Sequence, residues 1–125
     1  MLNAAADLAA HLDEAPVLLL ACAHKEYTPI AKMNVPRASL LAVHGSIFPA
    51  GQNILLACRA LSIGATLTTI HSFFEEPLKQ KLGVPDPMEI AARIPMGYPR
   101  GTCGPVSRNP VEEVIHWDRW GQQHG

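Results

Sequence analysis

The chain has 125 residues and a formal net charge of -1, with 48% hydrophobic and 17% charged residues. This length suits one domain, and the low charge argues against a disordered polyelectrolyte and against nucleic acid as a partner. The many apolar residues instead indicate that a second subunit or a further segment covers part of the surface.

The first predicted elements are a helix and a buried strand. Apolar residues recur at helical spacing over 4–12, and Pro16 ends this helix before an apolar strand at 17–22. The apolar run at 15–23 is shorter than the roughly 20 residues of a membrane span, so we expect no transmembrane helix. The start of the chain lacks a basic region, which argues against a secretory signal and favours a cytoplasmic protein.

The next segments are predicted as a loop, a helix and a threonine-rich strand. Two prolines and several charged residues predict a loop or lid over 25–44. Ser46 suits a helix cap and Pro49 a first helical turn, and the apolar residues of 47–61 predict a central helix buried by several neighbours. The β-branched threonines then favour an extended strand over 65–69.

The last third of the chain is expected to contain two helices and a strand. A short amphipathic helix at 75–82 has acidic residues early and basic residues late, which suits the helix dipole. Residues 88–92 form either a helical turn or the beginning of the following strand, in which Pro95 indicates an edge or a bulge. A short helix and an aromatic tail are expected over 111–125.

Sequence motifs of the common enzyme classes are missing from the chain. There is no P-loop, GxGxxG fingerprint, HExxH helix or GxSxG elbow, and no side chain is a convincing acid or base. The six histidines are never spaced as metal ligands on one element, so no metal site is expected. Three scattered cysteines, Cys22, Cys58 and Cys103, indicate reduced thiols rather than disulfides.

Three segments in their order and spacing resemble the C-terminal half of the nitroreductase family of flavin enzymes. They are GSIFPAGQNILLACRALSIGATLTT at 45–69, RIPMGYP at 93–99 and SRNP at 107–110. The resemblance extends over about 15–121 and implies an α+β, nitroreductase-like fold with a central buried helix packed on a small β-sheet. The family's usual N-terminal segment has no counterpart, so a partial fold is expected.

The resemblance also implies a cofactor site. In the family, the strand after the central helix meets the flavin ring, and the matching residues here are Leu67, Thr68 and Thr69. A basic residue before the final proline segment binds the FMN phosphate, which corresponds to Arg108. Judged without the resemblance, the threonines are ordinary strand formers and Arg108 is an ordinary surface arginine.

The function implied by the resemblance is that of an FMN-dependent oxidoreductase. It would take hydride from NAD(P)H and reduce nitro, quinone or related acceptors, as a homodimer with the flavin at the subunit interface. Two alternatives remain open. One is a catalytically inactive, truncated module that acts in dimerisation or partner binding, and the other is a small-molecule-binding protein without redox chemistry.

Overall fold

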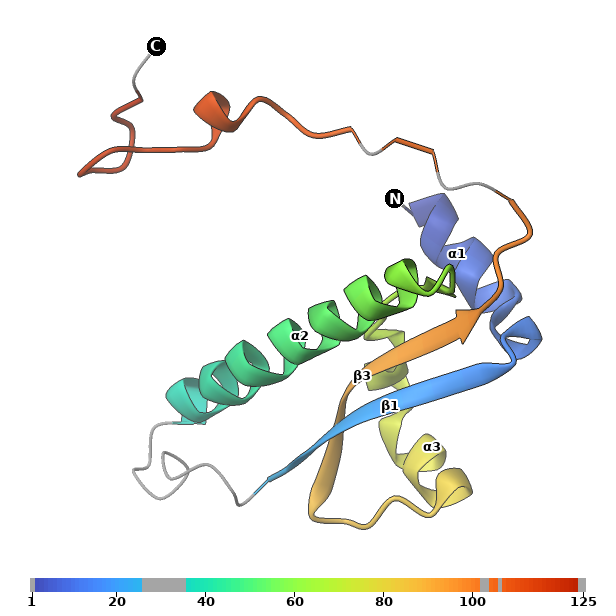
Figure 1. The fold of residues 1–125 in the computed structure, drawn as a ribbon. Helices are drawn as coiled ribbons and strands as arrows, with labels where there is room; N and C mark the ends of the chain where they lie inside the picture. The colour runs from blue at the N-terminus through green and yellow to red at the C-terminus, as the bar shows by residue number, and fades with distance from the viewer. Residues whose placement is uncertain (1, 26–35, 102–103, 106, 124–125) are drawn as a thin grey trace.

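A three-stranded antiparallel sheet lies at the centre of the chain (Figure 1). The computed structural model describes residues 2–25, 36–101, 104–105 and 107–123. Its strands have the order β1-β3-β2, and their bounds are Val17–His24, Met88–Gly97 and Gly64–Ala65. The helices are α1 at Leu2–Ala10, α2 at Pro36–Ala60 and α3 at Glu75–Leu82, with short 3-10 helices η1 at Leu12–Glu14, η3 at Ile70–Phe73 and η4 at Val111–Glu113. This architecture confirms the predicted α+β class.

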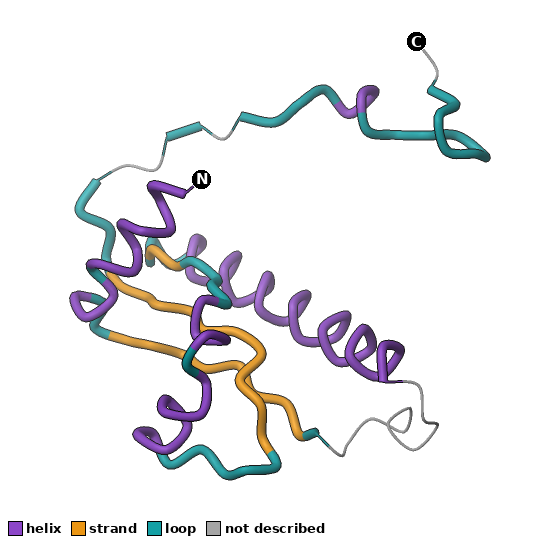
Figure 2. The backbone as a smooth tube through the Cα atoms, turned by 180° about the vertical axis from the view of Figure 1, so that it is seen from behind, coloured by secondary structure: helices purple, strands orange, loops and turns teal. Residues whose placement is uncertain are grey.

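The central strand, β3, separates two layers of the fold. Ile94 is fully buried and points toward α2, where a Cβ on Gly51 would lie 3.9 Å from Ile94 Cδ1. The next side chain along the strand, Arg93, points to the opposite face and lies over the ring of Phe74. In the two opposite views, α2 accordingly lies on one side of the sheet, and η3 and α3 lie on the other (Figures 1 and 2).

Pro95 lies within the central strand, so the prediction of an edge or a bulge at this residue is wrong. The register of the β1–β3 pair shifts instead opposite Ala21 and Cys22, whose partners are Ala92 and Ile90, so that Ala91 of β3 is the extra residue. The proline has no N–H to donate, and its nitrogen faces Thr66, where the ladder between β2 and β3 is interrupted. The strand therefore tolerates it. The Thr66 N–H still donates to the Pro95 carbonyl oxygen, at 3.4 Å. Residues 88–92 are part of this strand and do not form a helical turn.

The long helix α2 begins at Pro36, well before the predicted start at Ser46. Proline suits the first helical position, because that position needs no intrahelical N–H bond. Ser46 is therefore inside the helix, where its hydroxyl donates to the Ala42 carbonyl oxygen at 3.0 Å, and Pro49 is also internal. The loop predicted over 25–44 is thus wrong for 36–44, while 26–35 lie outside the described residues.

One side of α2 packs on the sheet, while much of the rest is exposed in the single chain. Over 41–60, the part of the helix whose burial is described, Gly51 and Cys58 are the buried residues, and Cys58 Sγ lies 3.5 Å from Met96 Sδ of β3. Large apolar side chains project elsewhere, with Leu41 63% and Leu56 58% exposed. The helix is central, but the expectation that several neighbours bury it is not met within one chain, because the sheet covers one side only.

The same helix meets the criteria of a membrane span by length and composition alone. The stretch Leu41–Ala60 has a mean hydropathy of 1.2, and the sequence-based expectation missed it because Gly45 and Pro49 interrupt the apolar run. The core helix of a soluble domain satisfies the same criteria but is mostly buried, whereas 11% of this stretch is buried in the single chain. Because α2 packs on the sheet through Gly51 and Cys58, the contacts of the fold account for its apolar composition on that side.

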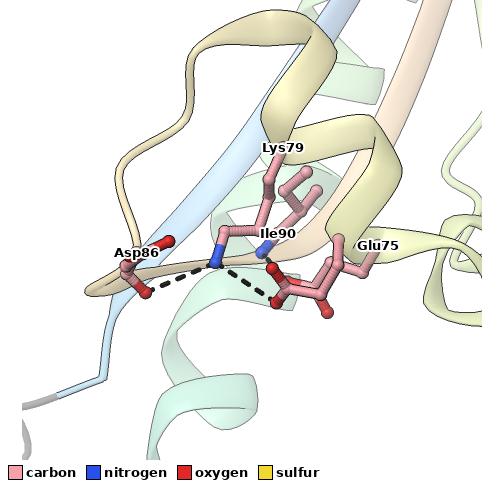
Figure 3. Close-up of polar contacts among 5 residues, drawn as sticks. Glu75, Lys79, Asp86 and Ile90 are labelled. Carbon is pink, nitrogen blue, oxygen red and sulfur yellow. Dashed lines mark hydrogen bonds and ion pairs between the residues drawn. The ribbon is translucent and has the colours of Figure 1, made fainter.

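A polar cluster joins α3 to the beginning of β3 (Figure 3). The buried Lys79 Nζ donates to the Asp86 carbonyl oxygen at 3.3 Å and lies 3.5 Å from Glu76 Oε1. Glu75 Oε1 accepts the backbone N–H of Ile90 at 2.8 Å. Both glutamates lie in the first turn of α3, where the helix dipole favours negative charge, so the predicted charge pattern of this helix also fixes its position against the sheet.

Beyond β3 the described chain leads away from the sheet (Figures 1 and 2). The short 3-10 helix η4 replaces the helix expected over 111–115. The Trp117 N–H donates to the Gln122 carbonyl oxygen at 2.8 Å, and the rings of His116 and Trp120 lie 4.2 Å apart. The tail therefore has a local structure of its own, with Trp120 90% exposed.

Candidate functional site

The threonine segment forms a free edge of the sheet beyond β2. The Thr68 N–H donates to the Arg93 carbonyl oxygen and the Arg93 N–H to the Thr68 carbonyl oxygen, both at 2.9 Å. Because successive residues of a strand direct their amide groups to opposite sides, Leu67 and Thr69 direct theirs away from β3. Within the described parts of the chain, the Leu67 N–H and C=O and the Thr69 N–H have no hydrogen-bond partner.

The side chains of this edge have different environments. The Leu67 side chain points toward α2, because a Cβ on Gly51 would lie 2.8 Å from Leu67 Cδ1. The Thr68 hydroxyl oxygen accepts the Ile70 N–H at 3.4 Å, which holds the turn into η3. Thr69 is exposed. Leu67 therefore offers its backbone to a ligand, whereas Thr69 offers both its backbone N–H and its hydroxyl.

A cavity of about 280 Å³ lies between this segment and the N-terminal helices. Apolar side chains from α1 and η1 form one wall, and η3 forms another. Thr68 and Thr69 contribute the hydroxyl groups, and Arg93 contributes a charge. Its lining residues are Leu8, Ala9, Leu12, Thr68, Thr69, Ile70, Phe73 and Arg93. The cavity thus combines a largely apolar wall with a small polar region, as is usual for sites that bind small molecules.

The charged residue of this cavity is almost completely buried. Arg93 is 3% exposed, and its Nε and Nη2 atoms have no hydrogen-bond partner among the described residues. Its Cζ lies 5.4 Å from the centroid of the Phe74 ring, a cation–π arrangement. Burial lowers the pKa of the Arg93 guanidinium from its ordinary value. Arginine nevertheless remains protonated in proteins, so a positive charge lies in the wall of the cavity.

Arg93 is not among the site residues that the sequence predicts. In the sequence it belongs to the RIPMGYP segment, although a single charge inside the apolar run IAARI of a central strand is unusual. Such a residue indicates either a buried ion pair or a ligand site. The structure shows no described acceptor for Nε and Nη2, so the arginine does not form a buried ion pair through these atoms with a described residue.

The fourth predicted site residue lies apart from the other three. The exposed Arg108 donates from Nη1 to the carbonyl oxygen of adjacent Ser107 at 2.8 Å. It belongs to the segment that leads away from the sheet (Figure 1). The structure therefore brings Leu67, Thr68 and Thr69 together at the edge, but it does not bring Arg108 to them within one chain.

Potential metal ligands and thiols do not form a further site in the described chain. No three His, Cys, Asp or Glu side chains of the described residues come close enough to hold a metal ion. Cys22 and Cys58 are free thiols, while Cys103 lies outside the described residues. The free edge and the adjoining cavity are consequently the candidate site.

Comparison with known proteins identifies the family. The model of the nitroreductase family matches residues 3–98. The chain belongs to the nitroreductase family. It is 27% identical over 114 residues to a candidate NADH dehydrogenase/NAD(P)H nitroreductase of Methanothermobacter thermautotrophicus, and the match covers 89% of this chain and 54% of that protein.

Solved structures agree with the family assignment at the level of the fold. A candidate oxidoreductase of Bacteroides fragilis has a TM-score of 0.69 at 20% identity, covering 94% of this chain and 52% of that one. A candidate NADH oxidase of Clostridium acetobutylicum also has a TM-score of 0.69, at 21% identity, covering 91% and 64%. The predicted nitroreductase-like fold is confirmed, and the chain spans about half to two thirds of the length of these three proteins.

Proposed function

We propose that this nitroreductase chain forms the flavin-binding part of an FMN-dependent NAD(P)H oxidoreductase that reduces nitro, quinone or related acceptors. The observation that carries the proposal is the free edge, where the Leu67 N–H and C=O and the Thr69 N–H have no partner in the described chain. Backbone groups left unpaired at the edge of a folded sheet are suited to a planar ligand with alternating donors and acceptors.

The residues of the edge fit the rim of a flavin ring. The two N–H groups would donate to ring nitrogen or carbonyl acceptors, and the Leu67 carbonyl oxygen would accept a ring N–H. The exposed Thr69 adds a hydroxyl at the same place. When bound, FMN would take up hydride from NAD(P)H and pass electrons to the acceptor. The chain's own contribution is then to position the ring and to stabilise the negative charge that reduction places on it.

Arg108 remains our candidate ligand for the FMN phosphate. A guanidinium can hold two phosphate oxygens at once through charge-assisted hydrogen bonds. The tail that carries Arg108 leads away from the edge of its own copy (Figure 1). We therefore include a homodimer in the proposal, because in a dimer the tail does not need to meet the edge of the same copy. A cytoplasmic location stays a prediction.

An absorbance spectrum of the purified protein before and after the addition of FMN tests this proposal. We expect the spectrum of a bound flavin, perturbed from that of free FMN, in a species whose gel-filtration mass is that of a dimer. Oxidation of NADH or NADPH should then depend on an added nitro compound or quinone. Protein that takes up no FMN, even after refolding with an excess of it, would refute flavin binding by this chain.

The exposed apolar side of α2 favours a second candidate function, a catalytically inactive module for dimerisation or partner binding. Leu41, Phe48 and Leu56 are 63%, 37% and 58% exposed. Apolar surface of this kind is typical of a helix that a second subunit covers. A flavin-free dimer would support this candidate over the first, and a well-dispersed, flavin-free monomer would count against it.

A further inference from the structure

The buried charge of Arg93 lies on the strand next to the free edge. Arg93 and Thr68 face each other in the sheet, and each donates its N–H to the other's carbonyl oxygen at 2.9 Å. Side chains of directly opposed residues in an antiparallel pair lie on the same face of the sheet. The side chains of Arg93 and Thr68 accordingly line the same cavity, together with Thr69. A ligand at the free edge is therefore separated from the strand of Arg93 by the threonine segment alone.

No described residue neutralises this charge. The Arg93 side chain is buried and forms no ion pair with a described residue. Its neighbours are neutral, because Leu20 and Thr68 flank it in the sheet and the Phe74 ring lies 5.4 Å from its Cζ. Glu75, which follows Phe74, uses its carboxylate to accept a backbone N–H of β3. The positive charge is thus screened neither by a described counterion nor by solvent.

The position of the guanidinium decides how it can act on a ligand. Nε and Nη2 are closed within the wall of the cavity, so these atoms do not donate hydrogen bonds to a ligand there. An electric field needs no such contact. Neighbouring strands are about 4.8 Å apart, so a ring that is hydrogen-bonded to the free edge lies roughly 10 Å from β3. At that separation and an effective dielectric constant of about 20, one unit charge changes an equilibrium that creates an opposite charge by about tenfold.

We propose that Arg93 makes a flavin bound at the free edge easier to reduce. This inference rests on the proposed function. Transfer of a hydride from NAD(P)H leaves NAD(P)+ and adds two electrons, one proton and one negative charge to the ring. The field of Arg93 stabilises the added charge, whereas it has little effect on the uncharged oxidised ring. Arg93 therefore sets the reduction potential from inside the wall, without touching the flavin.

The midpoint potential of the bound FMN, measured by equilibrium titration against a reference dye, tests the proposal. For Arg93→Met we expect the affinity for reduced FMN, relative to that for oxidised FMN, to fall about tenfold. For two electrons this corresponds to a potential about 30 mV more negative. Binding of oxidised FMN should change by less than about twofold, which distinguishes a lost charge from a distorted site.

Two further variants are the controls. Arg93→Lys keeps the charge and should retain most of the native potential. Lys81→Met removes an exposed positive charge from α3, on the same side of the sheet, and should leave the potential unchanged because solvent screens that charge. Arg93→Gln is a second neutral variant in case Arg93→Met does not fold.

The outcomes separate this inference from the proposed function. An unchanged potential in a folded neutral variant, or an equal loss in Arg93→Lys or Lys81→Met, would overturn the role of Arg93 and leave flavin binding intact. Failure of both neutral variants to fold would show that the guanidinium has a partner that neutralises it, which would also overturn the role. If the unchanged protein takes up no FMN, the proposed function fails, and this inference fails with it.

Discussion

Replacement of Arg93 by methionine should stabilise the ligand-free protein, which is the opposite of the usual effect of a core substitution. Methionine keeps an unbranched apolar side chain against the cavity wall and removes the guanidinium. In the native chain this group is buried, and its Nε and Nη2 atoms have no partner among the described residues. The substitution therefore removes two unsatisfied donors and a desolvated charge without breaking a described ion pair.

The size of the effect follows from the groups that are lost. A buried donor without a partner costs about 1–3 kcal/mol, so two such nitrogens cost about 2–6 kcal/mol. The cation–π contact of Arg93 with Phe74, at 5.4 Å, offsets this by about 1–2 kcal/mol. We expect Arg93→Met to raise the free energy of unfolding by about 1–4 kcal/mol. A gain of about 2 kcal/mol corresponds to a urea midpoint about 1 M higher at a slope of about 2 kcal/mol/M.

Equilibrium urea unfolding, followed by circular dichroism, measures this difference without any ligand present. Arg59→Met, an exposed substitution of the same kind on α2, should change the unfolding free energy by less than about 0.5 kcal/mol. A stabilised Arg93→Met with an unchanged slope would support an unpaired guanidinium. A variant destabilised by about 2 kcal/mol or more would show that the guanidinium has a partner in solution, and the reasoning about its open donors would be refuted.

The other predictions concern the flavin phosphate, the link between α3 and β3, and the half-buried thiol of Cys22. Arg108→Ala should weaken FMN binding by about 1.5–3 kcal/mol in a flavin titration, and unchanged affinity would remove Arg108 from the site. Glu75→Leu leaves the Ile90 N–H without its acceptor and should lower the free energy of unfolding by about 1–3 kcal/mol in urea unfolding. Glu75→Gln keeps an acceptor oxygen and should lower it less. Equal losses in the two variants would contradict the hydrogen bond. Partial burial, and secondarily the charge of Glu75, raises the pKa of the Cys22 thiol above its ordinary value of 9.0. The folded state therefore favours the neutral thiol. The free energy of unfolding should fall as the pH rises past 9.0 toward the folded pKa, because the thiol of the unfolded chain ionises first. Cys22→Ala should show a smaller fall between about pH 7 and about pH 10 in urea unfolding, and an identical pH dependence would exclude this thiol as its source.

The order of the elements could be predicted from periodicity, but the boundaries of α2 could not. Gly45 and Pro49 are typical of helix ends, and Ser46 is a common cap. In the folded chain, packing on β3 through Gly51 and Cys58 stabilises one continuous helix, so the local preferences of those three residues do not decide where it begins. The prediction of a strand edge or bulge at Pro95 is wrong for a related reason, because the effect of a proline on a strand depends on which neighbouring residue its nitrogen faces.

Part of the candidate site could likewise be inferred from the sequence. Residues 67–69 were predicted as a ligand-binding edge, and the structure places them side by side with unpaired backbone groups at Leu67 and Thr69. No pattern in the sequence could bring Arg93 into the same site. Its relation to Thr68 is a long-range strand pairing, and its lack of an acceptor depends on how α1 and η3 close over it.

Arg93 has two separate roles because a strand residue directs its backbone and its side chain differently. Its N–H and C=O hold Thr68 in the sheet, which leaves the Leu67 N–H and C=O and the Thr69 N–H without a partner in the described chain. Its side chain places a charge in the cavity on the face away from α2. Substitution of the side chain therefore alters the charge while the backbone ladder remains. For this reason, a variant such as Arg93→Met separates the chemistry of the cavity from the geometry of the free edge, which truncation or disruption of β3 cannot do.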